Sequence, residues 1–287
     1  MSCSDDLLSV AVQAARMAGE LLQERESLGT ELEVESKSTP TDLVSAADLA
    51  AERAIRELLE SERPDDGFVG EEGGSREGSS GLNWVVDPLD GTINYLFGIP
   101  QWCVSVAVRD GEGTVAGAVY DANRGELFTA TRDGAPSLLS SDGEETQLNA
   151  ASARTGTRGA QHEHGAQPAQ GAGAVEELGS ALVATGFAYD ARVRAAQARV
   201  LERVLPRVRD VRRLGSAALD LAWTAAGRYD AYFERTVKEW DIAAGVLICE
   251  RAGLEVLELP VHEDLPWGIL VARPGLAEVL MELVAGP

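Results

Sequence analysis

Lysine is nearly absent from this chain, and cysteine and histidine are scarce. Two of the 25 basic residues are lysines, Lys37 and Lys238, and the 287 residues include three cysteines and three histidines. Three cysteines cannot form a disulfide framework, and their spacing fits no zinc cluster, so we expect a reducing, cytoplasmic location. Long apolar runs are also missing. Without about 18 uncharged apolar residues in a row, or a basic start before an apolar stretch, neither a membrane span nor an export signal is predicted.

The deficit of basic residues makes the chain strongly acidic. It carries 47 acidic residues against 25 basic ones, a formal net charge of −22 at pH 7. Binding to nucleic acid depends on clustered cations, so we do not expect nucleic acid as a partner. Our hypothesis is a halophilic protein, because high salt shortens the reach of self-repulsion between acidic groups. An ordinary acidic cytosolic protein is the alternative.

Apolar periodicity predicts helices and short strands mixed along the chain. Apolar residues recur at helical spacing over residues 5–26 and 46–61. Strand-like runs follow, and a second mixture of strands and helices begins near residue 181. Such mixing is typical of an α/β fold with helix layers packed on sheets. The predicted strands of the first half are 84–86, 101–109, 114–120 and 126–130.

The periodicity fails between about residues 137 and 173, where Gly, Ala, Ser, Gln and Glu dominate. Such a segment has few large apolar residues to bury, and we interpret it as a flexible insertion. We therefore divide the chain into an N-terminal α+β part with the metal-binding motif (1–140), the insertion (141–179) and a C-terminal α/β part (180–287).

The most informative stretch reads WVVDPLDGTINY and contains two aspartates three residues apart, Asp87 and Asp90. Pro88 biases Asp87 towards extended backbone after a buried strand. Gly91 has no Cβ, so the chain can pass close to a bound group, and Thr92 can cap the following segment. Free N–H groups there would face an anion. The pattern indicates a phosphate-sized pocket, although a plain capped turn would use the same residues.

Two further acidic residues complete a candidate ligand set. Glu71 follows a strand signal, and Asp241 opens a helix that is apolar on nearly every face. Taken singly, a solvated glutamate and an N-cap aspartate would explain them. Together with Asp87 and Asp90 they supply hard oxygen ligands without histidine or cysteine, which suits Mg²⁺ rather than zinc.

These residues resemble the inositol monophosphatase family of Mg²⁺-dependent, lithium-sensitive phosphatases, which includes archaeal-type fructose-1,6-bisphosphatases and nucleotide 3′-phosphatases. The resemblance covers nearly the whole chain. It rests on GEE at 70–72, DPLDGTINY at 87–95 and WDIAAG at 240–245, with KSTPTDLV at 37–44, ATGF at 184–187 and RRLGSAALDLA at 212–222 in support. The last two are particularly similar to bacterial-type inositol monophosphatases. One departure concerns Gly134-Ala135-Pro136, which runs into the insertion where the family has a short hairpin.

The resemblance implies an αβαβα layered sandwich, a site with two or three Mg²⁺ ions, and roles for individual residues. Glu71 and Thr92 would act on the attacking water, and Asp87 would be the central catalytic ligand. The implied metal ligands are Glu71, Asp87, the carbonyl of Leu89, Asp90 and Asp241. The implied substrate contacts are Asp90, Gly91, Thr92, Gly215, Ser216, Ala217, Glu234 and Asp241.

By the same resemblance the protein would hydrolyse a small polyol or sugar phosphate, most plausibly inositol 1-phosphate, and would form a homodimer. Fructose-1,6-bisphosphatase is the nearest alternative, and a nucleotide 3′-phosphatase is less favoured. A mainly regulatory binding protein is the alternative from another class. The complete set of carboxylates argues against it, because an abandoned site should have lost at least one of them.

Overall fold

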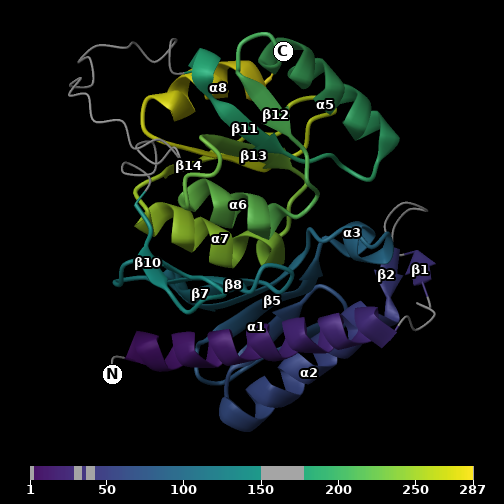
Figure 1. The fold of residues 1–287 in the computed structure, drawn as a ribbon, viewed down its shortest axis with the longest axis vertical. Coiled ribbons are helices and arrows are strands. Elements are labelled where there is room, and N and C mark those ends of the chain that lie inside the picture. Colours follow the sequence, from purple (N-terminus) through teal and green to yellow (C-terminus); the bar gives the residue numbers. More distant parts are fainter. Residues whose placement is uncertain (1–2, 29–33, 37–42, 150–177, 287) are drawn as a thin grey trace.

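The protein stacks five layers in the order helix, sheet, helix, sheet, helix (Figure 1). The structure is a computed structural model, and it describes residues 3–28, 34–36, 43–149 and 178–286. The expected αβαβα architecture is confirmed. The supporting sequence match that begins at Lys37 has its residues 37–42 outside the described part of the chain.

The first layer consists of α1 (Cys3–Leu28) and α2 (Ala46–Glu62), which pack against each other and against the larger sheet. The apolar residues that predicted α1 form its buried face, and small alanines there bring the helix close to the strands. Just before α2, β1 (Val34–Ser36) and β2 (Leu43–Ser45) form a small antiparallel pair.

The larger sheet has eight strands in the order β10-β9-β8-β7-β6-β5-β3-β4. It is antiparallel except where β5 pairs in parallel with β3. The parallel pairing puts the ends of β3 and β5 at the same edge of the sheet, where the first acidic motifs lie. The strands are β3 (Gly67–Gly70), β4 (Gly74–Arg76), β5 (Asn83–Asp90), β6 (Cys103–Asp110), β7 (Gly113–Asp121), β8 (Glu126–Thr131), β9 (Ser137–Leu139) and β10 (Glu145–Gln147).

The middle layer, α6 (Ala217–Ala225) and α7 (Glu239–Arg251), belongs to the C-terminal half but packs on the larger sheet. Small residues allow the close approach. A Cβ at Gly117 of β7 would lie 2.8 Å from the Cα of Ala244, and one at Gly245 would lie 2.7 Å from Leu221. The two halves therefore share a hydrophobic core instead of meeting at a wet interface.

The second sheet has five strands in the order β12-β11-β13-β15-β14, with α5 (Ala191–Val204) and α8 (Leu276–Val284) as the outermost layer. Residues after 180 were predicted to mix strands and helices, and they do. The strands are β11 (Leu182–Thr185), β12 (Asp210–Arg212), β13 (Ala231–Arg235), β14 (Glu255–Leu259) and β15 (Gly268–Ala272).

The predicted insertion needs a correction at its start. Residues 137–147 were assigned wholly or partly to it, but β9 and β10 form an antiparallel hairpin that extends the larger sheet. The chain turns through Gly143, whose φ is 84°. A short hairpin thus does follow Gly134, as in the related family. β9 is stabilised by pairing with the edge of β8, and β10 by pairing with β9; neither three-residue strand has a strong sequence signal of its own. Residues 150–177 lie outside the described part.

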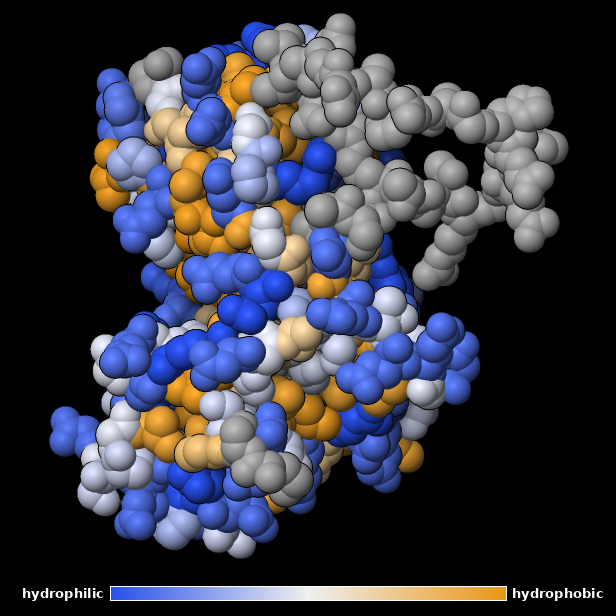
Figure 2. Space-filling view, turned by 90° about the vertical axis from the view of Figure 1, so that its left-hand side faces the viewer, coloured by the Kyte–Doolittle hydropathy of each residue, from blue (hydrophilic) through white to orange (hydrophobic). Residues whose placement is uncertain are grey.

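Within the described residues, no helix combines the length and the apolar character that crossing a bilayer requires. Hydrophilic residues cover much of the face shown in Figure 2, with smaller hydrophobic areas between them.

Candidate active site

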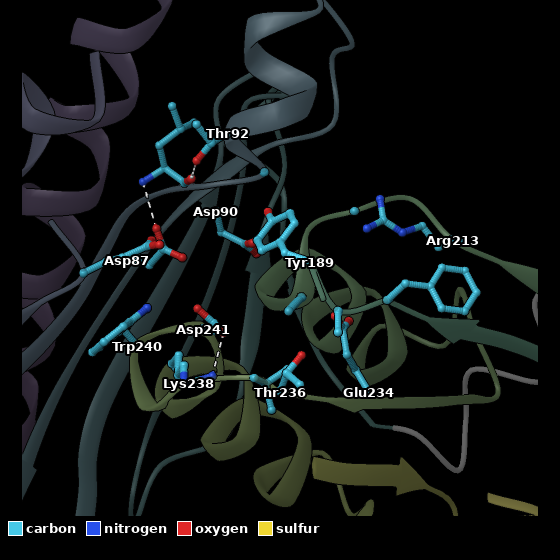
Figure 3. Close-up of a pocket in the computed structure, with 18 of the residues that line it drawn as sticks. Asp87, Asp90, Thr92, Tyr189, Arg213, Glu234, Thr236, Lys238, Trp240 and Asp241 are labelled. Carbon is cyan, nitrogen blue, oxygen red and sulfur yellow. Dashed lines mark hydrogen bonds between the residues drawn. The ribbon is translucent and has the colours of Figure 1, made fainter. Parts of the chain in front are cut away.

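A cavity of about 510 Å³ lies where the end of β5, the start of α7 and the second sheet meet. Acidic side chains from separate parts of the chain point into it (Figure 3). The structure brings together all but one of the residues that the sequence singled out. Those in the lining are Glu71, Asp87, Leu89, Asp90, Gly91, Thr92, Gly215, Ala217, Glu234 and Asp241.

Ser216 is the exception, because it lies behind the wall of the cavity. Its hydroxyl donates to Oδ2 of Asp90 over 2.7 Å, and the side chain is buried. The backbone N–H of Ala218 donates to the same oxygen over 2.6 Å. Ser216 thus holds a carboxylate in position, whereas the sequence predicted a direct contact with substrate.

A β-bulge near the end of β5 determines where the two aspartates of the central motif lie. The register between β5 and β6 shifts between Asp87 and Asp90, and Pro88, which has no N–H to donate, lies within this shift. The backbone N–H of Leu89 donates to Oδ1 of Asp87 over 3.0 Å. The bulge allows both carboxylates to line the cavity although they are three residues apart.

The third aspartate, Asp241, belongs to the first turn of α7. The helix begins at Glu239, two residues earlier than predicted, so Asp241 is not the N-cap. Its Oδ2 accepts the backbone N–H of Lys238 over 2.7 Å, which fixes the carboxylate at the helix start. Burial and the charge of Asp90 raise the pKa of Asp241 well above its usual range.

Glu71 is the first residue after β3, next to the end of β5. Its backbone N–H donates to the carbonyl of Val86 over 3.2 Å, which continues the parallel pairing of β3 with β5 by one residue. The side chain is only partly buried, whereas Asp87 and Asp90 are buried.

Burial and mutual repulsion raise the pKa values of the three aspartates. Burial, and then the charges of the other three carboxylates, raise the pKa of Asp87 well above its usual range. Burial raises the pKa of Asp90 to about 6, even though Ser216 and the start of α6 donate hydrogen bonds to it. Gathering these groups is costly unless a cation compensates them.

The donor set fits Mg²⁺. Carboxylate oxygens and a backbone carbonyl at Leu89 are the hard ligands that this ion takes. Among the residues that the structure describes, no group of three or more acidic, histidine or cysteine side chains lies close enough together to hold one metal ion. The carboxylates therefore surround the cavity, with room between them for ions and substrate.

Asp48 of α2 is a residue of this site for which no role was predicted. The hydroxyl of Thr92 lies 2.9 Å from Oδ1 of Asp48 and 3.1 Å from the carbonyl of Leu89, and can donate to either. Asp48 is fully buried. The only signal in the sequence was that the supporting motif at 37–44 leads to Asp48, which precedes Thr92 by 44 residues.

The opposite wall comes from the second sheet and its loops. Burial raises the pKa of Glu234 to about 7, against the hydrogen bond that Tyr232 donates over 3.0 Å and the charge of Arg213. A Cβ at Gly186 would overlap the carboxylate of Glu234, which explains the glycine in the ATGF stretch. Three further lining residues, Phe187, Arg213 and Trp240, belong to the quoted motifs but had no predicted role in the site. Lining residues outside those motifs are Ala188, Tyr189, Asp190, Val193, Thr236, Val237 and Lys238.

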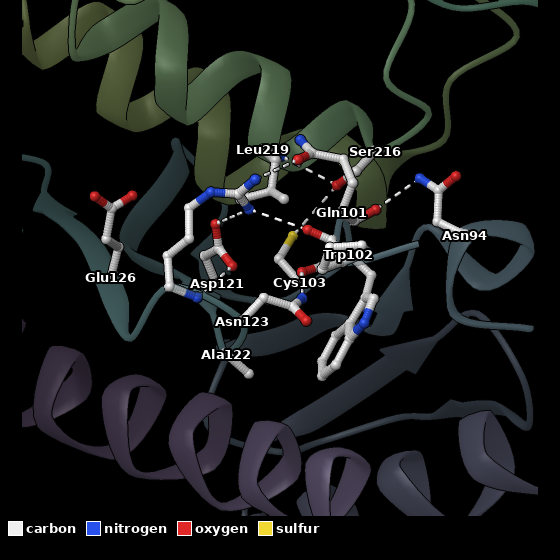
Figure 4. Close-up of polar contacts among 12 residues, drawn as sticks. Asn94, Gln101, Trp102, Cys103, Asp121, Ala122, Asn123, Glu126, Ser216 and Leu219 are labelled. Atoms are coloured by element: carbon white, nitrogen blue, oxygen red, sulfur yellow. Dashed lines mark hydrogen bonds and ion pairs between the residues drawn. The ribbon is translucent and has the colours of Figure 1, made fainter. Parts of the chain in front are cut away.

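The side chain of Asn94 links the two walls of the cavity by hydrogen bonds. Its side-chain amide donates to the carbonyl of Gln101 over 2.6 Å and to that of Leu214 over 2.8 Å, so it links the segment after α3 (Thr92–Leu96) to the loop before α6. Figure 4 shows Asn94 directed at the carbonyl of Gln101, beside Cys103 and Ser216. The motif residue Asn94 thus has a structural explanation.

Comparison with known proteins agrees with this layered fold and acid-lined cavity. The chain belongs to the inositol monophosphatase family, whose sequence model matches residues 4–285. The family is one of phosphatases, and it is generally metal-dependent.

Two relatives illustrate the range of names within the family. Inositol-1-monophosphatase SuhB of Mycobacterium tuberculosis is 40% identical over 254 residues, which cover 86% of this chain and 80% of the relative. Nus factor SuhB of Pasteurella multocida is 38% identical over 269 residues, 93% of this chain and 90% of the relative.

Solved structures agree on the fold. The extragenic suppressor protein suhB of Bartonella henselae superposes with a TM-score of 0.80 at 30% identity, covering 97% of this chain and 98% of that one. The IMPase of Thermotoga maritima gives a TM-score of 0.77 at 25% identity, covering 97% and 96%.

Proposed function

We propose that the protein is a Mg²⁺-dependent phosphomonoesterase that hydrolyses a small polyol or sugar phosphate, with inositol 1-phosphate as the preferred substrate. One observation carries the proposal: four carboxylates from β5, α7 and the turn after β3 line one cavity with the D-G-T backbone. The relative named inositol-1-monophosphatase supports the choice of substrate.

The carboxylates divide between two ion sites. Glu71, Asp87 and the carbonyl of Leu89 would hold one Mg²⁺, and Asp87, Asp90 and Asp241 a second, with Glu71 common to a weaker third. Bound Mg²⁺ supplies positive charge that compensates the negative charge developing on the phosphoryl group and on the leaving oxygen.

The chain itself supplies orientation. When the hydroxyl of Thr92 donates to Asp48, its oxygen is left to accept a hydrogen bond from a water molecule. With Glu71 on the other side, this water would be held for in-line attack on phosphorus, and Glu71 would take its proton. The backbone at Gly91 and Thr92 would hold the phosphate oxygens.

The second-sheet wall would recognise the alcohol part of the substrate. Ionised Glu234 can accept hydrogen bonds from ring hydroxyls, while Gly215 and Ala217 leave space beside it. Arg213 also lines this wall, and a cation there could take a second phosphate. That feature keeps fructose 1,6-bisphosphate as the alternative substrate, ahead of a nucleotide 3′-phosphate.

A regulatory role is a second candidate, because a relative that covers nearly the whole chain is named a Nus factor. A homodimer would fit the exposed side chains of Phe97 and Ile99, which are 72% and 47% accessible. Lithium inhibition and a cytoplasmic location remain predictions from the family resemblance.

The test is a panel of phosphate esters assayed with Mg²⁺ and with excess EDTA. We expect Mg²⁺-dependent release of phosphate, fastest from inositol 1-phosphate. Asp87→Asn and Asp241→Asn should lower turnover by several orders of magnitude, because each removes one charge from the ion sites. Glu239→Gln is the matched control, since Glu239 starts the same helix but pairs with Arg109 at the surface. Full activity in EDTA, or in either aspartate variant, would contradict the mechanism.

A further inference from the structure

A buried glutamate on α2, outside the lining of the cavity, holds the turn that carries Glu71. Glu52 is 3% exposed. Its Oε2 accepts the backbone N–H of Glu72 over 2.7 Å. A carboxylate that accepts a backbone N–H makes one of the stronger hydrogen bonds available to a protein. The peptide group that donates this hydrogen bond is the one that joins Glu71 to Glu72.

The glycines on both sides of this turn are shaped to the same carboxylate. A Cβ at Gly70 would overlap Oε2 of Glu52, and a Cβ at Gly73 would lie 2.5 Å from Oε1. The turn from 70 to 73 therefore folds closely around the end of the Glu52 side chain. Any residue larger than glycine at either position would force the carboxylate and the turn apart.

Glu52 follows Asp48 by one helical turn on the same helix. Residues four apart share a helix face, so both carboxylates point from α2 towards the active site. Asp48 receives the hydroxyl of Thr92, and Glu52 receives the backbone beside Glu71. One face of α2 thus contacts Thr92 and the turn that carries Glu71, the two residues that would act on the attacking water.

The position of Glu71 depends on the turn that carries it, because Glu71 is the first residue after β3. Glu71 stands in a turn, and its charge contributes to the raised pKa of Asp87, which shows that the groups repel. The turn must resist that repulsion for Glu71 to stay at the cavity.

We propose that Glu52 is a positioning residue for the reaction. Its hydrogen bond to the 70–73 turn and its packing against that turn keep Glu71 in place to bind a metal ion and the attacking water. The proposal rests on the proposed function. In this proposal Glu52 acts through its hydrogen bond to Glu72 and its fit against Gly70 and Gly73, and its charge does not act on the substrate.

Three variants of α2 test the proposal. Glu52→Ala removes the hydrogen bond to the turn and the packing against it. Glu52→Gln keeps an oxygen that can accept the Glu72 N–H, and Ile55→Ala is the control. Ile55 is fully buried on the same helix and faces the apolar core, so its truncation costs stability without touching the turn. The measurements are Mg²⁺ binding by calorimetry, kcat with inositol 1-phosphate, and amide hydrogen exchange over residues 68–76.

We expect Glu52→Ala to weaken Mg²⁺ binding and lower kcat by about 10- to 100-fold, the usual effect of removing a group that orients a metal ligand. Exchange over the turn should accelerate in the same variant. Glu52→Gln should stay within about threefold of the wild type, because it keeps the acceptor. Ile55→Ala should bind Mg²⁺ normally.

Unchanged exchange over the turn in Glu52→Ala would overturn the proposal, whatever the chemistry of the site. Equal losses of Mg²⁺ affinity in Glu52→Ala and Ile55→Ala would also overturn it, and so would a Glu52→Gln variant as impaired as the alanine variant. A wild type that binds no Mg²⁺ and hydrolyses no ester would refute the proposed function instead. The exchange experiment would still show whether Glu52 holds the 70–73 turn.

Discussion

Replacing Gly91 by alanine should cost far more than a glycine-to-alanine change normally does. The residue has a φ of 104°, which an L residue adopts only with strain of about 1–3 kcal/mol. A Cβ there would also lie 2.9 Å from the carbonyl oxygen of Gln101 and 3.1 Å from the Cα of Trp102. These are backbone atoms of a buried segment and cannot move aside, so overpacking adds about 1–3 kcal/mol. The expected loss in the free energy of unfolding is about 2–6 kcal/mol.

Gly98 offers a matched control seven residues further on. Its φ is 63°, but a Cβ there would meet no atom within 4 Å. Gly98→Ala should therefore show strain alone, about 1–2 kcal/mol. Urea unfolding followed by tryptophan fluorescence measures both variants. If Gly91→Ala is no less stable than Gly98→Ala, the close approach between Gly91 and the 101–102 backbone does not exist as described.

Three further predictions concern the acids, the salt response and a buried arginine. Because the pKa values of Asp87, Asp90 and Asp241 are raised, metal-free protein should lose stability from this site as pH rises from about 4 through 6. Mg²⁺ competes with those protons, so the rise in Tm that it causes should be larger at pH 8 than at pH 5; equal shifts would contradict the site. At a net charge of −22, Tm should increase with KCl towards molar concentrations, and a flat profile would reject the halophilic hypothesis. Arg235→Met should cost about 3 kcal/mol or more in urea unfolding, because four backbone carbonyl oxygens lose their donor; a loss below about 1 kcal/mol would show that water replaces it.

The long elements could be predicted because their signal is local. Alanines and leucines at helical spacing define the buried face of α1, and the alternation of apolar residues with turn signals separated the strands of the larger sheet. The hairpin of β9 and β10 could not, since strands of three residues depend on their neighbours: β9 pairs with β8, and β10 pairs with β9.

The residues of the candidate site, like the elements of the fold, could be predicted only in part. Glu71, Asp87, Asp90 and Asp241 were recognised because their residue types and linked motifs are chemically specific, and the structure lines one cavity with them. The position of Ser216 behind a carboxylate could not be deduced, because a serine at a helix start fits either role.

By itself, the sequence determined which residues can carry the chemistry, which segments form helices, and that the acidic residues offer hard oxygen donors. Only the tertiary structure decided that the shared face of α2 presents Asp48 to Thr92 and Glu52 to the turn beside Glu71. The physical reason is that hydrogen bonds between residues 20 and 44 positions apart depend on how α2 packs against β5, and no local pattern encodes that packing.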